Sequence, residues 1–198
     1  MEIVIASNNL HKIREFRGLL KGFKSIDLLS LVNFPSYLAP PEDGKTFQDN
    51  AIRKAEHAAK ELNKWVLADD SGLVVPALNG SPGVNSRRYA GEEATDSENR
   101  YKLLEAMLQL KSSQRSAYFE CCLALASPNG LKKCVTGLVE GVILLEEKGR
   151  NGFGYDSLFV KYEYDKSFAE LEEATKNRIS HRHKAFEKLT PTLESLES

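Results

Sequence analysis

The sequence predicts a mixed α/β fold on the basis of two observations. A short β-favouring run, residues 2–6, is followed at once by a segment of helical period that starts at Leu10. Two later strand-like runs, residues 115–126 and 131–145, are joined by Ser127-Pro128-Asn129-Gly130, a strong signal for an antiparallel hairpin. We therefore expect a sheet that is mixed rather than purely parallel.

The composition is that of an ordinary globular chain. Hydrophobic residues make up 41% and charged residues 28% of the 198 positions, which suits a single domain. The net charge of −1 indicates no polyanion-binding surface, so we expect no nucleic-acid partner. No run approaches membrane-spanning length, so we expect no membrane partner either. The three cysteines give no disulfide framework, and thiols of this kind are typical of the reducing cytoplasm.

The first helix and the connection after it are predicted from turn-forming residues, prolines and a glycine. Ser7-Asn8-Asn9 breaks the first strand with turn-forming residues, and the helix from Leu10 presents apolar residues on one face. Residues 33–44 are rich in proline and end in glycine, so they should form an irregular connection. The apolar face of the first helix consists of Ile13, Phe16 and Leu20.

A second helix is expected after this connection. Thr46 followed by Asp49 resembles a capping box in which Asp replaces the usual Glu. Alanine dominates the stripe expected to be buried, which implies close packing, and polar residues occupy a neighbouring stripe. The buried stripe is Phe47, Ala51, Ala55, Ala58 and Leu62, and the polar stripe is Asn50, Lys54 and His57.

The most informative stretch is the apolar run Trp65-Val66-Leu67-Ala68, which ends abruptly in Asp69-Asp70-Ser71-Gly72. The run indicates a buried strand that stops at the carboxylates, where ligands gather in parallel sheets. With ordinary pKa values near ~3.9, both aspartates are anionic at neutral pH and repel each other unless a cation lies beside them. Hard oxygen ligands suit Mg²⁺ or Mn²⁺. The alternative is that Asp69 caps a turn and that Asp70 is solvated.

The second half of the chain contains another helix and a compact loop. Thr95 and Glu98 form a capping box that opens a helix with Leu103, Leu104, Met107 and Leu108. Gly152-Phe153-Gly154-Tyr155-Asp156 leads into a strand at residues 157–160. Its glycines allow a ligand to approach the backbone, and its aromatic residues can stack on a base. A tight structural turn with a core Phe is the alternative.

A last helix is expected from about Ser180 to Leu189, stopped by Pro191. As the N-cap, Ser180 would place His181 and Arg182 at the helix start, where cations oppose the dipole. Such a placement is favoured by a bound anion or polar ligand.

Lys12 is a candidate phosphate ligand. It lies in the first turn of a helix, where backbone N–H groups and the positive end of the dipole favour phosphate. The segment from Ser7 to Lys12 lacks the glycines and spacing of a Walker P-loop. The alternative for Lys12 and Lys54 is a solvated surface lysine, and for Glu42 a solvated carboxylate.

Six motifs in order span nearly the whole chain. They are Ser7-Asn8-Asn9-Leu10-His11-Lys12, Thr46-Phe47-Gln48-Asp49-Asn50-Ala51 with Lys54, Ala68-Asp69-Asp70-Ser71-Gly72-Leu73, Ser81-Pro82-Gly83 with Arg88-Tyr89-Ala90-Gly91, Gly152-Phe153-Gly154-Tyr155-Asp156, and Ser180-His181-Arg182. In series they resemble the non-standard purine nucleoside triphosphate pyrophosphatases, the dITP/XTP pyrophosphatases. Two positions depart from that family: Asn8 stands where glycine is common, and Asp49 stands where glutamate is usual. Asn tolerates positive φ better than most residues, and Asp49 keeps the capping role.

The resemblance implies a single bilobed domain over residues 1–198, with a long central β-sheet flanked by helices and a nucleotide cleft between two lobes. It also implies a homodimer that hydrolyses ITP, dITP and XTP to the monophosphate and pyrophosphate, with one Mg²⁺ per subunit. Asp70 would be metal ligand and proton acceptor, and Glu42 the second metal ligand. The residues that would hold phosphates and sugar are Ser7, Asn8, Asn9, Leu10, His11, Lys12, Lys54, Ser71 and Lys176, and those that would hold the base are Phe153, Gly154, Tyr155, Asp156, His181 and Arg182.

Two other function classes stay open. A related pyrophosphatase that selects modified pyrimidines or dTTP would differ in base specificity. A module that senses nucleotides without turnover would release no pyrophosphate, and the intact Asp70 argues against it. An arginine fork at Arg182 matches the O6 and N7 acceptors of hypoxanthine and xanthine, which predicts ITP and XTP ahead of GTP, with ATP and pyrimidines last. Asp69 is expected to point away from Asp70 and to support the site from outside.

Overall fold

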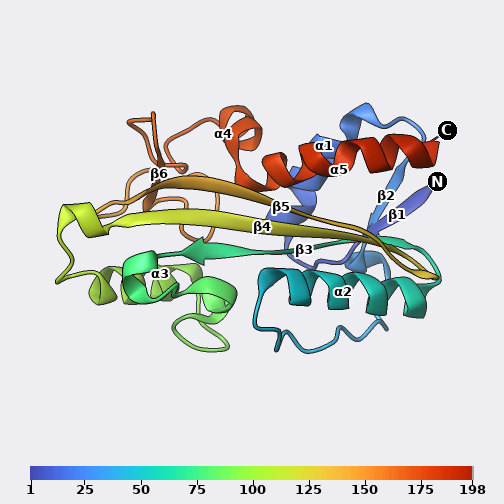
Figure 1. Cartoon of the computed structure of the whole chain (residues 1–198), viewed down its shortest axis with the longest axis horizontal. Helices are drawn as coiled ribbons and strands as arrows, with labels where there is room; N and C mark the ends of the chain where they lie inside the picture. The colour runs from blue at the N-terminus through green and yellow to red at the C-terminus, as the bar shows by residue number, and fades with distance from the viewer. Residues whose placement is uncertain (198) are drawn as a thin grey trace. The chain divides into compact units, whose positions relative to one another are not determined.

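The computed structural model describes residues 1–197 and contains a six-stranded sheet in the order β2-β1-β3-β4-β5-β6 (Figure 1). β1 (Glu2–Ile5) pairs in parallel with β2 (Asp27–Ser30) and with β3 (Trp65–Val74). β4 (Ser116–Ser127) follows β3 in the sheet, and β5 (Gly130–Ile143) pairs antiparallel with β6 (Phe159–Lys161). The predicted mixed α/β fold is confirmed.

The chain divides into two compact units, and strands β3, β4 and β5 each contribute residues to both. The first unit comprises residues 1–70 and 121–137 together with the chain from Arg182 onward. The second comprises residues 71–120 and 138–181. Within residues 1–197, none of the helices combines the length and the apolar character needed to cross a membrane.

In the first unit, helices cover both faces of the sheet. α1 (Leu10–Leu19) and α5 (His181–Glu197) lie on one face, and α2 (Phe47–Leu62) lies on the other (Figure 1). Because side chains alternate along a strand, every second residue of β1 and β3 points toward α1 and α5. The core on that side includes Ile3, Ile5, Ile13, Phe16, Leu20, Leu67, Leu123, Leu125, Phe186, Leu189 and Leu193. On the other side α2 packs through the fully buried Ala51, Ala55 and Ala58, as its alanine stripe predicted.

The second unit is built around aromatic side chains. The ring of Phe119 lies 4.8 Å from that of Phe159 and 6.0 Å from that of Phe168, measured between centroids. α3 (Asp96–Ala106) adds the fully buried Leu103 to this core, and the short α4 (Glu173–Ile179) ends directly before Ser180. The unit therefore has its own apolar centre.

The predicted helix starts agree with the structure. Asn9 caps α1 by accepting hydrogen bonds from the backbone N–H groups of His11 and Lys12. The Thr46 hydroxyl accepts the backbone N–H of Asp49 at 3.0 Å, and Thr95 with Glu98 forms the predicted capping box of α3. These short-range signals depend on residues three apart and need no tertiary contact.

Several predicted boundaries were wrong. β3 does not stop at the carboxylates but runs on to Val74, since its neighbour β4 continues beside it after the pairing with β1 has ended at Leu67. The strand expected from residue 157 starts at Phe159, because a turn closed by the Leu158 N–H and the Tyr155 carbonyl precedes it. β2 and α4 were not predicted.

The last helix passes through Pro191 instead of stopping before it. Leu189 and Leu193 on either side of the proline are both fully buried. Their packing outweighs the loss of the one backbone hydrogen bond that proline cannot donate.

Candidate functional site

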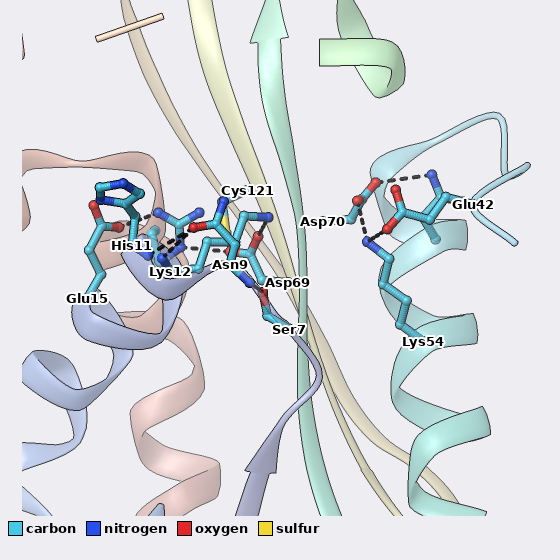
Figure 2. Close-up of polar contacts among 12 residues, drawn as sticks. Ser7, Asn9, His11, Lys12, Glu15, Glu42, Lys54, Asp69, Asp70 and Cys121 are labelled. Carbon is cyan, nitrogen blue, oxygen red and sulfur yellow. Dashed lines mark hydrogen bonds and ion pairs between the residues drawn. The ribbon is translucent and has the colours of Figure 1, made fainter. Parts of the chain in front are cut away.

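β3 holds the two neighbouring aspartates on opposite faces of the sheet within the first unit (Figure 2). Asp69 shares the face of Leu67, toward α1 and α5, and Asp70 points toward α2. Both are buried, with 2% and 6% of their surface exposed. Each carboxylate has cations of its own, so the repulsion expected between adjacent anions is relieved by separation rather than by one shared ion.

The Asp70 carboxylate is held by α2. Lys54 Nζ donates to Asp70 Oδ1 at 2.8 Å, and Asn50 Nδ2 donates to Oδ2 at 3.1 Å. Asn50 and Lys54 are four residues apart and share one side of the helix. Lys54 Nζ also lies 2.6 Å from Glu42 Oε1, which comes from the connection before α2 (Figure 2). The structure thus brings together Asp70, Lys54 and Glu42, three of the predicted site residues.

Burial sets the protonation behaviour of this group. It raises the pKa of Asp70 above its ordinary value, although Lys54 and Lys12 act in the opposite direction. Burial would lower the pKa of Lys54, but Asp70 and then Glu42 raise it. The lysine therefore keeps its charge, while Asp70 accepts a proton more readily than a solvated aspartate does.

The donor set on this face fits Mg²⁺. Asp70 and Glu42 offer carboxylate oxygens, the hard ligands that Mg²⁺ prefers. The Glu42 side chain is 40% exposed, so this carboxylate pair reaches solvent. Within residues 1–197, no group of three or more His, Cys, Asp or Glu residues could hold a metal ion. Since Mg²⁺ is commonly bound by one or two carboxylates with substrate phosphates completing its shell, two carboxylates suit an ion that binds together with a phosphate substrate.

On the opposite face, Asp69 belongs to a row of four charged side chains, of which Lys12 is partly exposed. We name the row the Glu15–Arg182 chain, and its members are Glu15, Arg182, Asp69 and Lys12. Lys12 Nζ donates to Asp69 Oδ1, and Arg182 Nε donates to Oδ2 at 2.8 Å. Arg182 Nη1 in turn donates to Glu15, and the Cys121 thiol donates to Asp69 Oδ2 at 3.1 Å. Burial alone would raise the pKa of Asp69, but Arg182 and then Lys12 hold it well below its ordinary value. Asp69 therefore stays ionised.

The segment from Ser7 to Lys12 forms the turn between β1 and α1. The Ser7 hydroxyl accepts the Asn9 backbone N–H at 3.1 Å, and Asn9 Oδ1 accepts that of His11 at 2.9 Å. Asn8, Leu10 and His11 are exposed. Within residues 1–197, the non-glycine residues with positive φ are Asn63, Asn79 and Glu163, so asparagine in place of glycine at position 8 causes no backbone strain.

In the second unit the loop from Phe153 to Asp156 is fixed by Lys176. Lys176 Nζ donates to Asp156 Oδ2 at 2.7 Å and lies 4.7 Å from the centroid of the Phe153 ring. The Phe153 N–H donates to the same carboxylate at 2.9 Å. Gly152 has φ +77°, and a Cβ there would lie 2.1 Å from Asp156 Oδ2, so only glycine fits.

The remaining residues of this loop are bonded to the body of the second unit. Gly154 N–H donates to Asp96 at 2.7 Å, and Arg100 Nη1 donates to the Gly154 carbonyl at 2.9 Å. The Tyr155 hydroxyl donates to the Ser86 carbonyl at 2.9 Å from a buried ring. Tyr155 is therefore a core residue. Ser71, half-buried on β3, also belongs to this unit.

His181 and Arg182 follow Ser180, whose extended backbone (φ −73°, ψ 159°) precedes α5 as an N-cap residue would. The His181 ring stacks on Phe119 at 4.8 Å and 11°. Arg182 is 1% exposed, and its Nε and Nη1 point at Asp69 and Glu15. This geometry disfavours the predicted base contact by the Arg182 fork, because two buried carboxylates already engage it.

Sequence reasoning missed Glu15, Cys121 and the role of Asn50. Glu15 is buried, and it lies three residues after Lys12 and directly before Phe16 in the sequence. An acidic residue next to the apolar face of the first helix was therefore the signal that could have indicated a buried charge. Asn50 stood out only as a member of the polar stripe of α2. Nothing local marks Cys121, whose thiol meets Asp69 through strand pairing.

The fold and the site define a mixed α/β protein whose central strand presents a buried aspartate to a lysine and a second carboxylate. The Ham1 family model matches residues 3–192. A protein of Protochlamydia amoebophila (strain UWE25) named dITP/XTP pyrophosphatase is 65% identical, and the match covers 99% of each chain. A protein of Chlamydia abortus with the same name is 54% identical over 99% of this chain and 96% of the relative.

Two solved structures are also similar to this chain, both in sequence and in fold. A HAM1 protein from Coxiella burnetii has 44% identity and a TM-score of 0.89, covering 98% of this chain and 99% of its own. The Staphylococcus aureus Ham1 protein has 43% identity and a TM-score of 0.88, covering 99% and 100%. This chain belongs to the Ham1 family, and the resemblance indicated by the six motifs is confirmed.

Proposed function

We propose that this chain hydrolyses the non-standard purine nucleoside triphosphates ITP, dITP and XTP to the monophosphate and pyrophosphate. The observation that carries the proposal is the Asp70 carboxylate, buried and bonded to Lys54 beside Glu42. Support comes from the relatives named dITP/XTP pyrophosphatase, which match almost the full chain. The reaction removes non-standard purine nucleotides from the nucleotide pool.

The side chains around Asp70 suit cleavage between the α- and β-phosphates. Asp70 orients the attacking water and accepts its proton, for which a raised pKa is favourable. Lys54 and Lys12 neutralise charge on the phosphates as it develops on the leaving pyrophosphate. Asp70 and Glu42 would hold Mg²⁺, which would supply further charge neutralisation when bound.

The proposal assigns the nucleoside to residues of the second unit. Phe153, with Lys176 and Asp156 fixing its loop, contacts the base, and His181, whose ring stacks on Phe119, is assigned to the same subsite. The proposal also includes dependence on Mg²⁺ (with Mn²⁺ as the substitute), a homodimer, and a cytoplasmic location in which the thiols of Cys121, Cys122 and Cys134 stay reduced. Sedimentation at micromolar concentration tests the dimer, since a species of 22.1 kDa would refute it.

A panel of nucleoside triphosphates with product identification tests the reaction. With Mg²⁺, ITP should yield IMP and pyrophosphate, and ITP, dITP and XTP should exceed GTP, ATP and the pyrimidines. IDP and orthophosphate as first products would refute the assignment of the cleaved bond. Preference for dTTP or a modified pyrimidine would establish the related pyrophosphatase instead. Binding without turnover of any substrate would indicate a nucleotide-sensing module.

A further inference from the structure

The Glu15–Arg182 chain has one member that reaches solvent. The side chains of Glu15, Arg182 and Asp69 are 9%, 1% and 0% exposed, whereas that of Lys12 is 16% exposed. The order of contacts is Glu15 to Arg182, Arg182 to Asp69, and Asp69 to Lys12. The row therefore starts in the interior and ends at the ammonium group of Lys12.

Stability does not account for such a row. Buried ion pairs often contribute no more than apolar side chains of the same volume would, because desolvation of the charges offsets their attraction. What a row of fixed charges does provide is a defined position for each member. Glu15, Arg182 and Asp69 are buried, so only Lys12 Nζ can contact a ligand from solvent, and the row fixes the position of this atom.

Arg182 also prevents a competing contact. Glu15 and Lys12 are three residues apart on α1, a spacing at which oppositely charged side chains pair directly. A direct pair would hold Lys12 along its own helix and away from β3. In the structure Glu15 is engaged by Arg182 Nη1, and Lys12 is left to Asp69.

We propose that Glu15 is a positioning residue that sets the Lys12 ammonium for the phosphates of the substrate, acting through Arg182 and Asp69. The inference rests on the proposed function, in which Lys12 holds phosphate. Two positive and two negative members make the row neutral. Without the Glu15 charge, the Arg182 fork turns both donors to Asp69 in a bidentate pair, which displaces Lys12 from that carboxylate.

The test compares Glu15→Gln with Glu15→Asp and with the control Glu187→Gln, which alters an α5 glutamate whose side chain is 64% exposed. Two measurements are made: kcat and KM for ITP, and the Kd of inorganic tripolyphosphate, a probe without base or sugar. Glu15→Gln should raise KM and the tripolyphosphate Kd together by about tenfold with a smaller change in kcat. Glu15→Asp should recover most of both, and the control should match the wild type.

The double variant Glu15→Gln/Arg182→Gln separates positioning from a structural role. It is neutral and has no arginine to compete for Asp69, so tripolyphosphate should bind more tightly to it than to Glu15→Gln. It also keeps the proposal testable if the single variant fails to fold, because its Kd should then approach that of the wild type. An unchanged KM and Kd in Glu15→Gln, with kcat lowered only in proportion to the folded fraction, would overturn the proposal. A wild type that does not hydrolyse ITP would instead overturn the proposed function.

Discussion

The two faces of β3 treat the same residue type in opposite ways. Asp69 faces Arg182 and Lys12, both directed at its oxygens, and its pKa falls well below the ordinary value. Asp70 faces Lys54, which it shares with Glu42, and burial raises its pKa. The positive charges around Asp69 outweigh the effect of its burial on the pKa, whereas those around Asp70 do not.

Under the proposed function, the difference separates a structural anion, Asp69, from a reactive one, Asp70. A fully compensated carboxylate gains nothing from a further cation or proton, so Asp69 can only hold its partners in place. An undercompensated one favours a proton or a metal ion, as chemistry at a phosphate requires. The alternation of side chains along the strand is what delivers Asp70, rather than its neighbour, to the face of α2.

Asp70→Asn should have the largest effect of these substitutions, because it alters the carboxylate on the α2 face of β3. The amide removes the proton acceptor and a metal ligand, so turnover of ITP should fall by at least ~10²-fold in a pyrophosphate-release assay. Burial of the ionised Asp70 costs stability, and its pair with Lys54 offsets part of that cost, so the melting temperature of this variant should change less than that of Asp69→Asn. Near-normal turnover at saturating Mg²⁺ would show that Asp70 is not the acceptor.

Asp69→Asn alters the carboxylate on the other face of β3 and should reduce the stability of the fold. It leaves Arg182 and Lys12 with an uncompensated buried charge, for which a loss of about 3–5 kcal/mol in the free energy of unfolding is expected. Urea denaturation measures it. A midpoint equal to that of the wild type would mean that the pairs around Asp69 contribute nothing to the fold.

Glu42→Gln should have a milder effect, confined to metal dependence. It removes one of two carboxylates beside Lys54, so the Mg²⁺ titration of activity should shift to higher concentration while kcat at saturation changes little. Asp43→Asn is the matched control, since this neighbour is 69% exposed and pairs with Arg53. Removal of Mg²⁺ with a chelator should abolish turnover in all three proteins, and activity that survives chelation would refute the metal assignment.

The smallest effect expected is on the acid limb of stability. The folded pKa of Asp69 is depressed, so its stabilisation is complete above the ordinary value of 3.8 and is lost as pH falls through the folded pKa. Below pH 3.8 the melting temperature of Asp69→Asn should therefore fall less steeply than that of Asp70→Asn. Parallel curves for the two variants would contradict the opposite pKa shifts.

Prediction from the sequence succeeded where the cause was local. The caps at Thr46 and Thr95, the start of α1 at Leu10 and the hairpin after Ser127 depend on residues within one turn, and each lies where expected. The placement of Asp70, Glu42 and Lys54 in one site was expected only from the family resemblance carried by the motifs. That Asp69 points away from Asp70 was also expected, from the alternation along a strand.

The failures depend on contacts distant in sequence. The length of β3 is set by β4, and the passage of α5 through Pro191 is set by the burial of Leu189 and Leu193. The contact of Arg182 with the base, expected from the resemblance and from the match of its fork to O6 and N7, stays a prediction, but its buried ion pairs were not foreseen. Its burial between Glu15 and Asp69 depends on three elements far apart along the chain, which no local pattern reveals.

Position 152 of this protein tolerates almost no residue other than glycine. Any side chain there would collide with Asp156 Oδ2 and push it off both Lys176 and the Phe153 N–H. Gly18 on α1 has no neighbour within 4 Å of the place where a Cβ would stand. In a library that samples all amino acids at both positions under selection for activity, position 18 should return a broad spectrum and position 152 glycine almost alone.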